Sequence, residues 1–335
     1  MGENSKIEWT HHTFNPWRGC TKVSAGCANC YAERQSLRNP RVLGVWGDDG
    51  VRVKASEAGW REPRKWNREA ADRGVPSRVF CASMADVFEF REDVMLARAI
   101  LLNLIHETRH LDWLLLTKRP EHIEPLLKRA RNDLFGLHLH DARVMVDRWI
   151  AGEPPANVWL GVSVENQACA DQRIPILLRT PAAKRFVSYE PALGPVDFTR
   201  ISLGQSGFVP NGPILQGVET LNWYMDALRG APKTGIAGLD WIIIGGESGA
   251  DAREFKLEWV MQAHEQCKAS GIPLFFKQMG RFVTQENVNN SDWPDGTVFD
   301  GHGTHVASAR IALRDKKGGD MAEWPDDLRV REFPI

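Results

Sequence analysis

The chain has 335 residues, of which 43% are hydrophobic and 25% charged, enough apolar material to build one large domain or two smaller ones. A net charge of −1 excludes a chain-wide attraction to nucleic acids or anionic membranes, so any polyanionic partner needs a local basic patch. The polar N-terminus does not resemble a signal peptide, and no apolar run reaches the roughly 18 residues that span a bilayer. Cys81, Cys169 and Cys267 lie singly, as is typical of a reducing compartment. We therefore expect a cytoplasmic protein with no membrane partner.

Short apolar runs alternate with amphipathic segments along most of the chain. The runs are continuous, as in parallel strands covered on both faces; they are RVFCAS (78–83), LDWLLLTK (111–118), NVWLGVSV (157–164), KRFVSYE (184–190), LDWIIIGGE (239–247) and IPLFFKQ (272–278). The segments 92–108, 120–131 and 256–271 have helical periodicity, and the last ends on a glycine suited to the end of a helix. This alternation predicts an α/β fold with parallel strands in a full or partial (β/α) barrel.

Two stretches interrupt this pattern, and a third follows it. Residues 131–156 and 201–238 are longer than usual connections and partly rich in Gly and Pro, so they are predicted to be insertions. Beyond residue 280 the pattern dissolves into polar sequence. We expect a barrel over residues 1–280 and a C-terminal extension, residues 281–335, packed on it as irregular structure or as a small β element.

Charged side chains stand at the ends of the predicted strands. Because loops after parallel strands converge at one end of a barrel, these charges predict a polar site there. The alternative is that they only mark the solvent boundary. The residues are Asp86, Lys118 with Arg119, Glu165, Glu190, Glu247 and Lys277.

Three cysteines lie within eleven residues, as Cys20-x6-Cys27-x2-Cys30. No fourth cysteine completes a tetrahedral zinc set, although His11 or His12 upstream leaves a Cys₃His site open. Three thiolates in a loop also suit a [4Fe–4S] cluster with one iron open for a substrate or cofactor. Structural thiols without a metal are the third interpretation.

These motifs carry a family resemblance. FNPWRGCTKVSAGCANCYAER, CASMADVFE, LLTKRP, VSYEPALGPV, WIIIGGESGADAR and PLFFKQMG follow one another between roughly residues 8 and 280, and they resemble a bacteriophage-type family of radical-SAM-like proteins. More distantly, the layout is similar to spore photoproduct lyase, which repairs a thymine dimer in DNA. The resemblance implies a radical-SAM-type barrel with a [4Fe–4S] cluster on Cys20, Cys27 and Cys30. It also implies that S-adenosylmethionine (SAM) binds the open iron and is cleaved to a 5′-deoxyadenosyl radical. The usual first gap of three residues is six here.

The resemblance also assigns individual residues. Asp86, with Ser83, would hold the SAM amino group, and Lys118 would hold its carboxylate. Ser163 would lie near the SAM ribose. A zwitterionic ligand needs one anion and one cation placed separately, so this division of roles is physically consistent.

Five further residues are candidates for the chemistry. The lyase resemblance implies hydrogen transfer through Tyr31, directly after Cys30, and more loosely through Cys81. Tyr31 packing beneath the cysteine loop is the alternative. Catalytic or substrate contacts are predicted for three of the strand-end charges, with a buried ion network as the alternative; these are Glu190, Glu247 and Lys277.

The expected partners follow from the same reasoning. Residues 59–78 interleave Trp60 and Trp66 with basic side chains, which suits a nucleic-acid backbone with base stacking, and DNA is the implied substrate. A solvated helix face anchored by two core tryptophans is the alternative. An external electron donor such as flavodoxin or ferredoxin is implied, and a separately encoded partner protein is expected from the family.

Two other classes of function remain. GGESGA (245–250) approaches a nucleophile elbow and GHGTHVAS (301–308) matches a subtilisin histidine segment, which together would offer Ser248 and His305 to a serine hydrolase. That class leaves the three cysteines unexplained. A non-catalytic iron–sulfur or zinc-binding interaction protein of phage origin accounts for them and is the main alternative to an enzyme.

Overall fold

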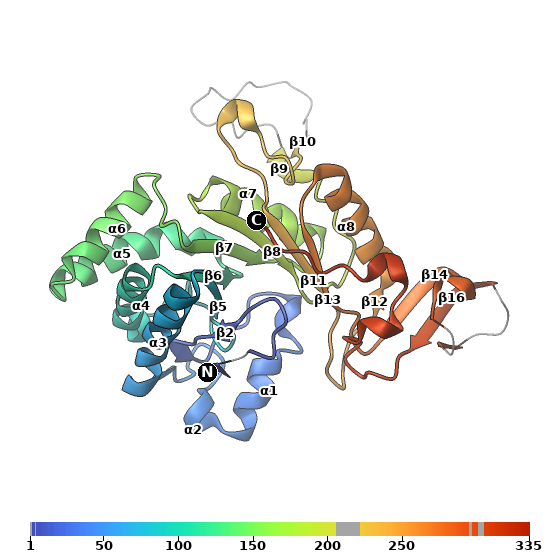
Figure 1. Ribbon diagram of the computed structural model, residues 1–335, viewed down its shortest axis with the longest axis horizontal. Coiled ribbons are helices and arrows are strands. Elements are labelled where there is room, and N and C mark those ends of the chain that lie inside the picture. The colour runs from blue at the N-terminus through green and yellow to red at the C-terminus, as the bar shows by residue number, and fades with distance from the viewer. Residues whose placement is uncertain (1, 4, 206–221, 295–296, 301–304) are drawn as a thin grey trace. The chain divides into compact units, whose positions relative to one another are not determined.

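The computed structural model describes residues 2–3, 5–205, 222–294, 297–300 and 305–335 (Figure 1). The chain forms two compact units. The first contains residues 1–163 and 180–188, and the second contains residues 164–179 and 189–335. The predicted C-terminal extension belongs to the second unit.

A parallel sheet is the centre of the first unit. Its strands follow the order β2-β5-β6-β7-β8, and β1 (Gly2–Glu3) pairs antiparallel with β2. Every residue of β7 is buried, which explains why its sequence reads as one continuous apolar run. The parallel strands are β2 (His12–Thr13), β5 (Ser77–Cys81), β6 (Leu111–Thr117), β7 (Val158–Ser163) and β8 (Lys184–Tyr189).

The helices of the first unit lie between these strands in the chain. Ser56 caps α3 by accepting a hydrogen bond from the Gly59 N–H at 3.2 Å. The predicted insertion 131–156 is largely helical, since it holds the end of α5 and all of α6. The helices are α1 (Tyr31–Arg38), α2 (Pro40–Leu43), α3 (Glu57–Arg73), α4 (Met95–Glu107), α5 (Ile123–Gly136) and α6 (His140–Ile150).

The second unit contains a further parallel pair, β11 (Trp241–Gly245) and β13 (Leu274–Gln278). Between them in the chain lies α8 (Leu257–Ser270), which ends at Gly271 in the left-handed conformation, as its sequence predicts. The remaining helix is α7 (Gln167–Arg179), and the smaller strands are β9 (Ile201–Gln205), β10 (Asn222–Met225), β12 (Phe255–Lys256), β14 (Val283–Asn289), β15 (Val298–Asp300) and β16 (His305–Ala312).

The predicted fold class, α/β with parallel strands in a partial barrel, is confirmed. All six predicted strands are present, and the short β2 adds a seventh parallel strand. The predicted insertion 201–238 holds the antiparallel pair of β9 and β10, and its residues 206–221 lie outside the described part of the chain.

The C-terminal extension packs against β13. The Phe276 N–H donates to the Val330 carbonyl at 2.9 Å, the Glu332 N–H donates to the Leu274 carbonyl at 2.9 Å, and the Trp324 ring lies 4.6 Å from that of Phe276. Before that, β14, β15 and β16 form a small sheet with β12. Among the described residues, none of the helices has the length and apolar character that a bilayer crossing requires.

Candidate functional site

The three clustered cysteines lie on one loop of the first unit, between β3 (Trp17–Arg18) and α1. Cys27 ends a single 3₁₀ turn, residues 25–27, and Cys30 directly precedes α1. All three are half-buried free thiols. The Val23 N–H donates to the Cys27 sulfur at 3.5 Å. We call residues 20–30 the cysteine loop.

The environment of the outer two cysteines keeps them as neutral thiols. Burial, with the nearby Asp86 carboxylate, raises the pKa of Cys20 to about 12, although Arg119 opposes the rise by donating to its sulfur at 3.8 Å. Burial also raises the pKa of Cys30, against the opposing N–H groups of the first turn of α1. Since a thiolate is the reactive form, neither thiol is suited to act as a free nucleophile near neutral pH.

Asp86 lies in the loop after β5, and its hydrogen bonds connect that loop to the end of β6. Its Oδ1 accepts from the Phe88 N–H at 2.9 Å and from the Thr117 hydroxyl at 2.8 Å. Its Oδ2 accepts from the Lys118 N–H at 3.1 Å and from Arg119 Nη1 at 2.9 Å. A carboxylate has about four acceptor sites, so those of Asp86 are filled by this chain.

A second buried carboxylate, Glu89, lies three residues further along the same loop. It accepts a two-pronged contact from Arg52, at 2.8 Å from Nε and 2.7 Å from Nη2. The same Nη2 donates to the Thr21 hydroxyl at 2.9 Å, next to Cys20. Arg119 reaches Thr21 as well, donating to its carbonyl at 2.7 Å. The start of the cysteine loop is thus attached to both carboxylates through two guanidinium groups.

Tyr31 attaches the other end of the cysteine loop to the same region. Its hydroxyl donates to the Ser83 carbonyl at 2.7 Å, while 53% of the residue remains exposed. Asn15 holds this segment by donating to the Ser83 hydroxyl at 3.1 Å and by accepting from the Met84 N–H at 2.7 Å. Both ends of the cysteine loop therefore rest on residues 83–89.

The structure brings most of the predicted site residues of the first unit together. The cysteine loop, Tyr31, Ser83 and Asp86 meet around the C-terminal ends of β5 and β6, and Lys118 follows β6 directly. Ser163, buried, ends the neighbouring strand β7. Cys81 is the last residue of β5 and is fully buried, which raises the pKa of its thiol well above the usual value.

The predicted site residues of the second unit form ion pairs. Lys277 donates to Glu190 at 2.9 Å, and Glu247 accepts from Arg253 Nη2 at 2.6 Å and from the Arg253 N–H at 2.9 Å. A third pair, Glu165 and Arg173 at 3.0 Å, is fully buried. The pairs of Glu190 and Glu247 share no residue and are partly exposed, and the catalytic roles of Glu190, Glu247 and Lys277 stay predictions.

The histidines upstream of the cysteines are engaged elsewhere. His11 Nδ1 accepts from the Arg78 N–H at 2.8 Å, and His12 stacks on Trp66 with ring centroids 4.4 Å apart. Within the described ranges, no three His, Cys, Asp or Glu side chains converge tightly enough to ligate a single metal ion. The arrangement therefore gives no support to a Cys₃His zinc site.

The helix proposed for base stacking is anchored by its tryptophans. Trp66 is buried against His12, and the half-buried Trp60 contacts Phe14 edge to face at 5.1 Å. A buried indole is not available to stack on a base, so the alternative of a solvated helix face fits these contacts better.

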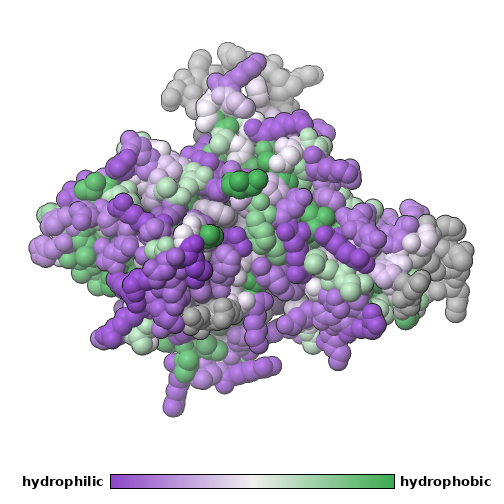
Figure 2. Space-filling view, in the orientation of Figure 1, coloured by the Kyte–Doolittle hydropathy of each residue, from purple (hydrophilic) through white to green (hydrophobic). Residues whose placement is uncertain are grey.

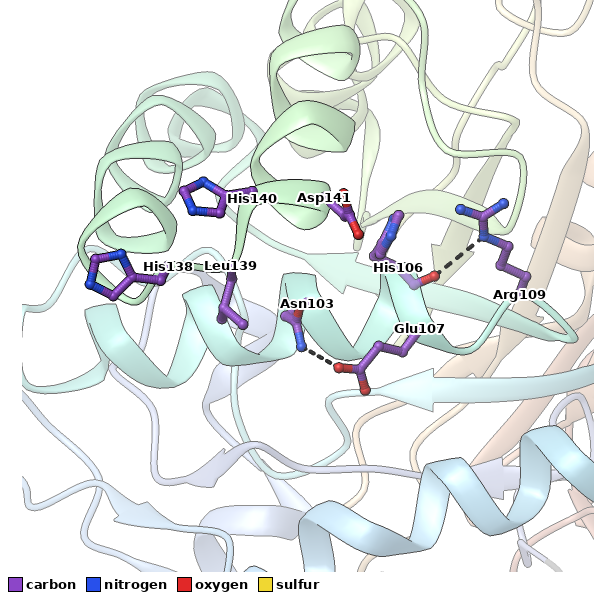
Figure 3. Close-up of a pocket in the computed structure, with 8 residues that line it drawn as sticks. All are labelled: Asn103, His106, Glu107, Arg109, His138, Leu139, His140 and Asp141. Atoms are coloured by element: carbon purple, nitrogen blue, oxygen red, sulfur yellow. Dashed lines mark hydrogen bonds between the residues drawn. The ribbon is translucent and has the colours of Figure 1, made fainter.

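A pocket of about 460 Å³ lies on the first unit but away from these residues (Figure 3). Arg109, on its wall, precedes β6, whereas the site above follows the opposite end of that strand. Its three histidines do not converge, because the rings of His138 and His140 point away from that of His106 (Figure 3). Glu107 is already bound by Arg64 at 2.6 Å. We do not assign a ligand to this pocket.

The serine-hydrolase hypothesis requires Ser248 and His305. Ser248 is exposed in the second unit, and the side chain of His305 is not among those that the structure describes.

No local sequence pattern indicates the buried residues that hold the cysteine loop, namely Arg52, Glu89 and Asn15. Arg52 and Glu89 are 37 residues apart and belong to no motif, so no local pattern joins them. Arg119 was visible as a charge after β6, but its contact with the cysteine loop was not.

Taken together, the fold and these contacts define a partial-barrel α/β protein with a thiol-bearing loop at the C-terminal ends of two neighbouring strands. The family model described as "Protein of unknown function (DUF5131)" matches residues 4–307, and the chain belongs to that family. Comparisons with curated proteins and with solved structures find no match.

Proposed function

We propose that the protein is a radical SAM enzyme whose [4Fe–4S] cluster is held by Cys20, Cys27 and Cys30. The observation that supports this most directly is the placement of three free thiols on one loop that rests on the ends of β5 and β6. Active sites of (β/α) barrels form at this end of the strands.

The donor set fits such a cluster. Thiolates are the usual ligands of iron–sulfur clusters, and three of them leave one iron open. A four-iron cluster is wider than a single ion, so three thiolates that ligate it need not converge on one point. When bound, the cluster would supply the electron that cleaves SAM to a 5′-deoxyadenosyl radical.

The surrounding residues would then orient SAM. Lys118, directly after β6, would bind its carboxylate, and Ser83 and Ser163 would bind its polar edges. Asp86 was predicted to bind the SAM amino group, but its four acceptor sites are used within the chain. In this proposal Asp86 acts mainly by fixing Arg119, and an amino group would have to displace one of these donors.

Tyr31 and Cys81 differ as candidates for hydrogen transfer. Tyr31 combines an exposed ring with a hydroxyl fixed on Ser83, so a substrate could approach it. Cys81 is fully enclosed in β5, which leaves Tyr31 as the better candidate. A DNA substrate rests on the resemblance to spore photoproduct lyase alone.

The surface beside the cysteine loop suits an acidic electron carrier such as a flavodoxin or ferredoxin. Apart from the buried Arg52, residues 18–54 contain six Lys or Arg and three Asp or Glu, a net charge of +3 in a chain of net charge −1. Leu37, Val42 and Val51 are each at least half exposed there, and Figure 2 shows hydrophobic side chains over α2. Basic side chains around an apolar centre favour an acidic protein partner.

The test is anaerobic reconstitution with iron and sulfide, followed by electron paramagnetic resonance of the reduced protein with and without SAM. We expect a [4Fe–4S]⁺ signal that changes shape when SAM is added, and release of 5′-deoxyadenosine with dithionite. The Cys169→Ser variant, which removes a thiol outside the cysteine loop, serves as the control and should behave as wild type. Stoichiometric zinc with no cluster would refute the proposal and favour a zinc-binding interaction protein.

A further inference from the structure

We propose that Arg52 is the positioning residue of the cysteine loop, and that it holds the loop in shape before any metal binds. The inference rests on the proposed function only in taking the ligand of the loop to be a metal group. Its basis is a buried guanidinium whose contacts connect three separate segments: the cysteine loop, residues 44–51, and the loop after β5.

The backbone brings Arg52 to the cysteine loop. Strand β3 pairs antiparallel with β4 (Val53–Lys54), with Arg18 opposite Val53, so Arg52 lies beside Gly19. Gly19 has a φ of +107°, and a Cβ there would lie 3.0 Å from Arg52 Cδ. A glycine at this position therefore leaves room for the arginine stem just before Cys20.

The guanidinium then uses its donors on all three segments. Its contact with Glu89 is two-pronged, and both groups are almost fully enclosed, with side-chain exposures of 0% and 4%. Nη1 donates at 2.9 Å to the carbonyls of Val45 and Gly50, and Nη2 donates at 2.9 Å to the Thr21 hydroxyl. A planar fork can make these bonds at once, which a lysine cannot.

The same arrangement fixes both ends of the cysteine loop. Thr21 is held by Arg52 through its hydroxyl and by Arg119 through its carbonyl, and Tyr31 is held on Ser83. Cys27 makes contacts inside the loop, accepting from Val23 and donating its N–H to the Ser24 carbonyl at 2.9 Å. The ends of the cysteine loop, which carry Cys20 and Cys30, are therefore in place before a metal is loaded.

This inference separates the shape of the loop from metal binding. In many small metal sites the loop folds only when the metal binds, because no other interaction offsets the conformational entropy that the loop loses on ordering. Here buried hydrogen bonds to an ion pair stabilise the ordered loop, and losing one partner of such a pair is strongly destabilising. The metal-free loop should therefore stay ordered.

The test is hydrogen–deuterium exchange of metal-free and reconstituted protein, with iron content measured on the same samples. In wild type, amides of residues 19–31 should exchange at similar rates with and without metal. Arg52→Met should speed exchange in residues 19–31 and 44–51 by at least about tenfold while β6 and β7 keep their protection. Arg173→Met, which breaks a buried ion pair in the second unit, is the matched control and should leave residues 19–31 unchanged.

Two milder variants cover the case in which Arg52→Met does not fold. Arg52→Lys keeps a charge beside Glu89 and loses the fork, and Thr21→Val loses one acceptor at nearly constant volume. Both should give smaller increases confined to the same segments. Fast exchange in metal-free wild type, or unchanged exchange in both milder variants, would overturn the inference. If wild type takes up no iron, the proposed function fails, whereas the exchange comparison still decides the role of Arg52.

Discussion

The two units place charged residues after their parallel strands in different ways. In the first unit the strand-end carboxylate Asp86, with Glu89 in the same loop, binds guanidinium groups that reach outward to the cysteine loop. In the second unit, Glu190 and Glu247 pair with a lysine and an arginine of the same unit. The first unit thus differs in that its strand-end charges contact the loop that carries the three thiols.

The largest expected effect comes from removing the thiols themselves. Replacing Cys20, Cys27 or Cys30 with serine should reduce bound iron after reconstitution to background and abolish the reduced-cluster signal. Thermal unfolding should change little, since the loop is half-buried and is held by other residues. Iron retained at the wild-type level in any of the three variants would contradict the ligand assignment.

Breaking one buried arginine contact in each unit tests the comparison directly. Arg119→Met and Arg173→Met each leave a buried carboxylate without its cation, which should lower the free energy of unfolding by about 3–5 kcal/mol. Only Arg119→Met should also lower iron uptake, because Arg119, unlike Arg173, contacts Thr21 and Cys20. Chemical denaturation and iron analysis measure the two effects. Equal iron loss in both variants would show that uptake follows global stability.

Charge reversal at the basic surface should act on electron delivery. The double variant Arg38→Glu/Arg41→Glu should slow reduction of the reconstituted protein by flavodoxin about tenfold at low salt, with the difference shrinking as salt rises. Reduction by dithionite, which needs no docking, should be unchanged. Lys128→Glu, on α5, is the control. A flavodoxin rate that does not respond to the double variant would exclude this surface.

The ion pair of Lys277 and Glu190 should contribute less. Its side chains are 22% and 15% exposed, so Lys277→Met should cost about 1 kcal/mol in the free energy of unfolding. If Lys277 only stabilises the second unit, 5′-deoxyadenosine release should stay at the wild-type rate. A loss of that release with intact cluster and fold would instead support the predicted catalytic role.

The effect expected from His11 is confined to acidic pH. Burial and the neighbouring Arg78 lower the pKa of His11 from 6.5 to about 4. Between these values the unfolded chain binds a proton that the folded chain does not, so stability falls as the pH drops from 6.5 to 4. His11→Gln should make the free energy of unfolding less dependent on pH in that window. The free energy of unfolding is measured by denaturant titration at several pH values. If its dependence on pH is the same in the variant as in wild type, His11 does not titrate in this way.

The sequence predicted the fold well and the site only in part. Continuous apolar runs located the six strands, because strands buried on both faces have no alternation to obscure them. Asp86 and Lys118 were visible as charges immediately after such runs. Arg52, Glu89 and Asn15 were not, since their roles arise from contacts between segments far apart in the chain. The sequence alone does not distinguish a buried arginine from an exposed one.

Because these contacts join segments far apart in the chain, the site cannot be moved to another protein as one continuous peptide. A designer who copied residues 20–30 into another barrel would bring the thiols but neither Arg52 nor the two carboxylates that Arg52 and Arg119 bind. The smallest portable unit is discontinuous: residues 15–54, residues 83–89 and residues 117–119. Gly19 must travel with it, because a side chain there would crowd the arginine stem.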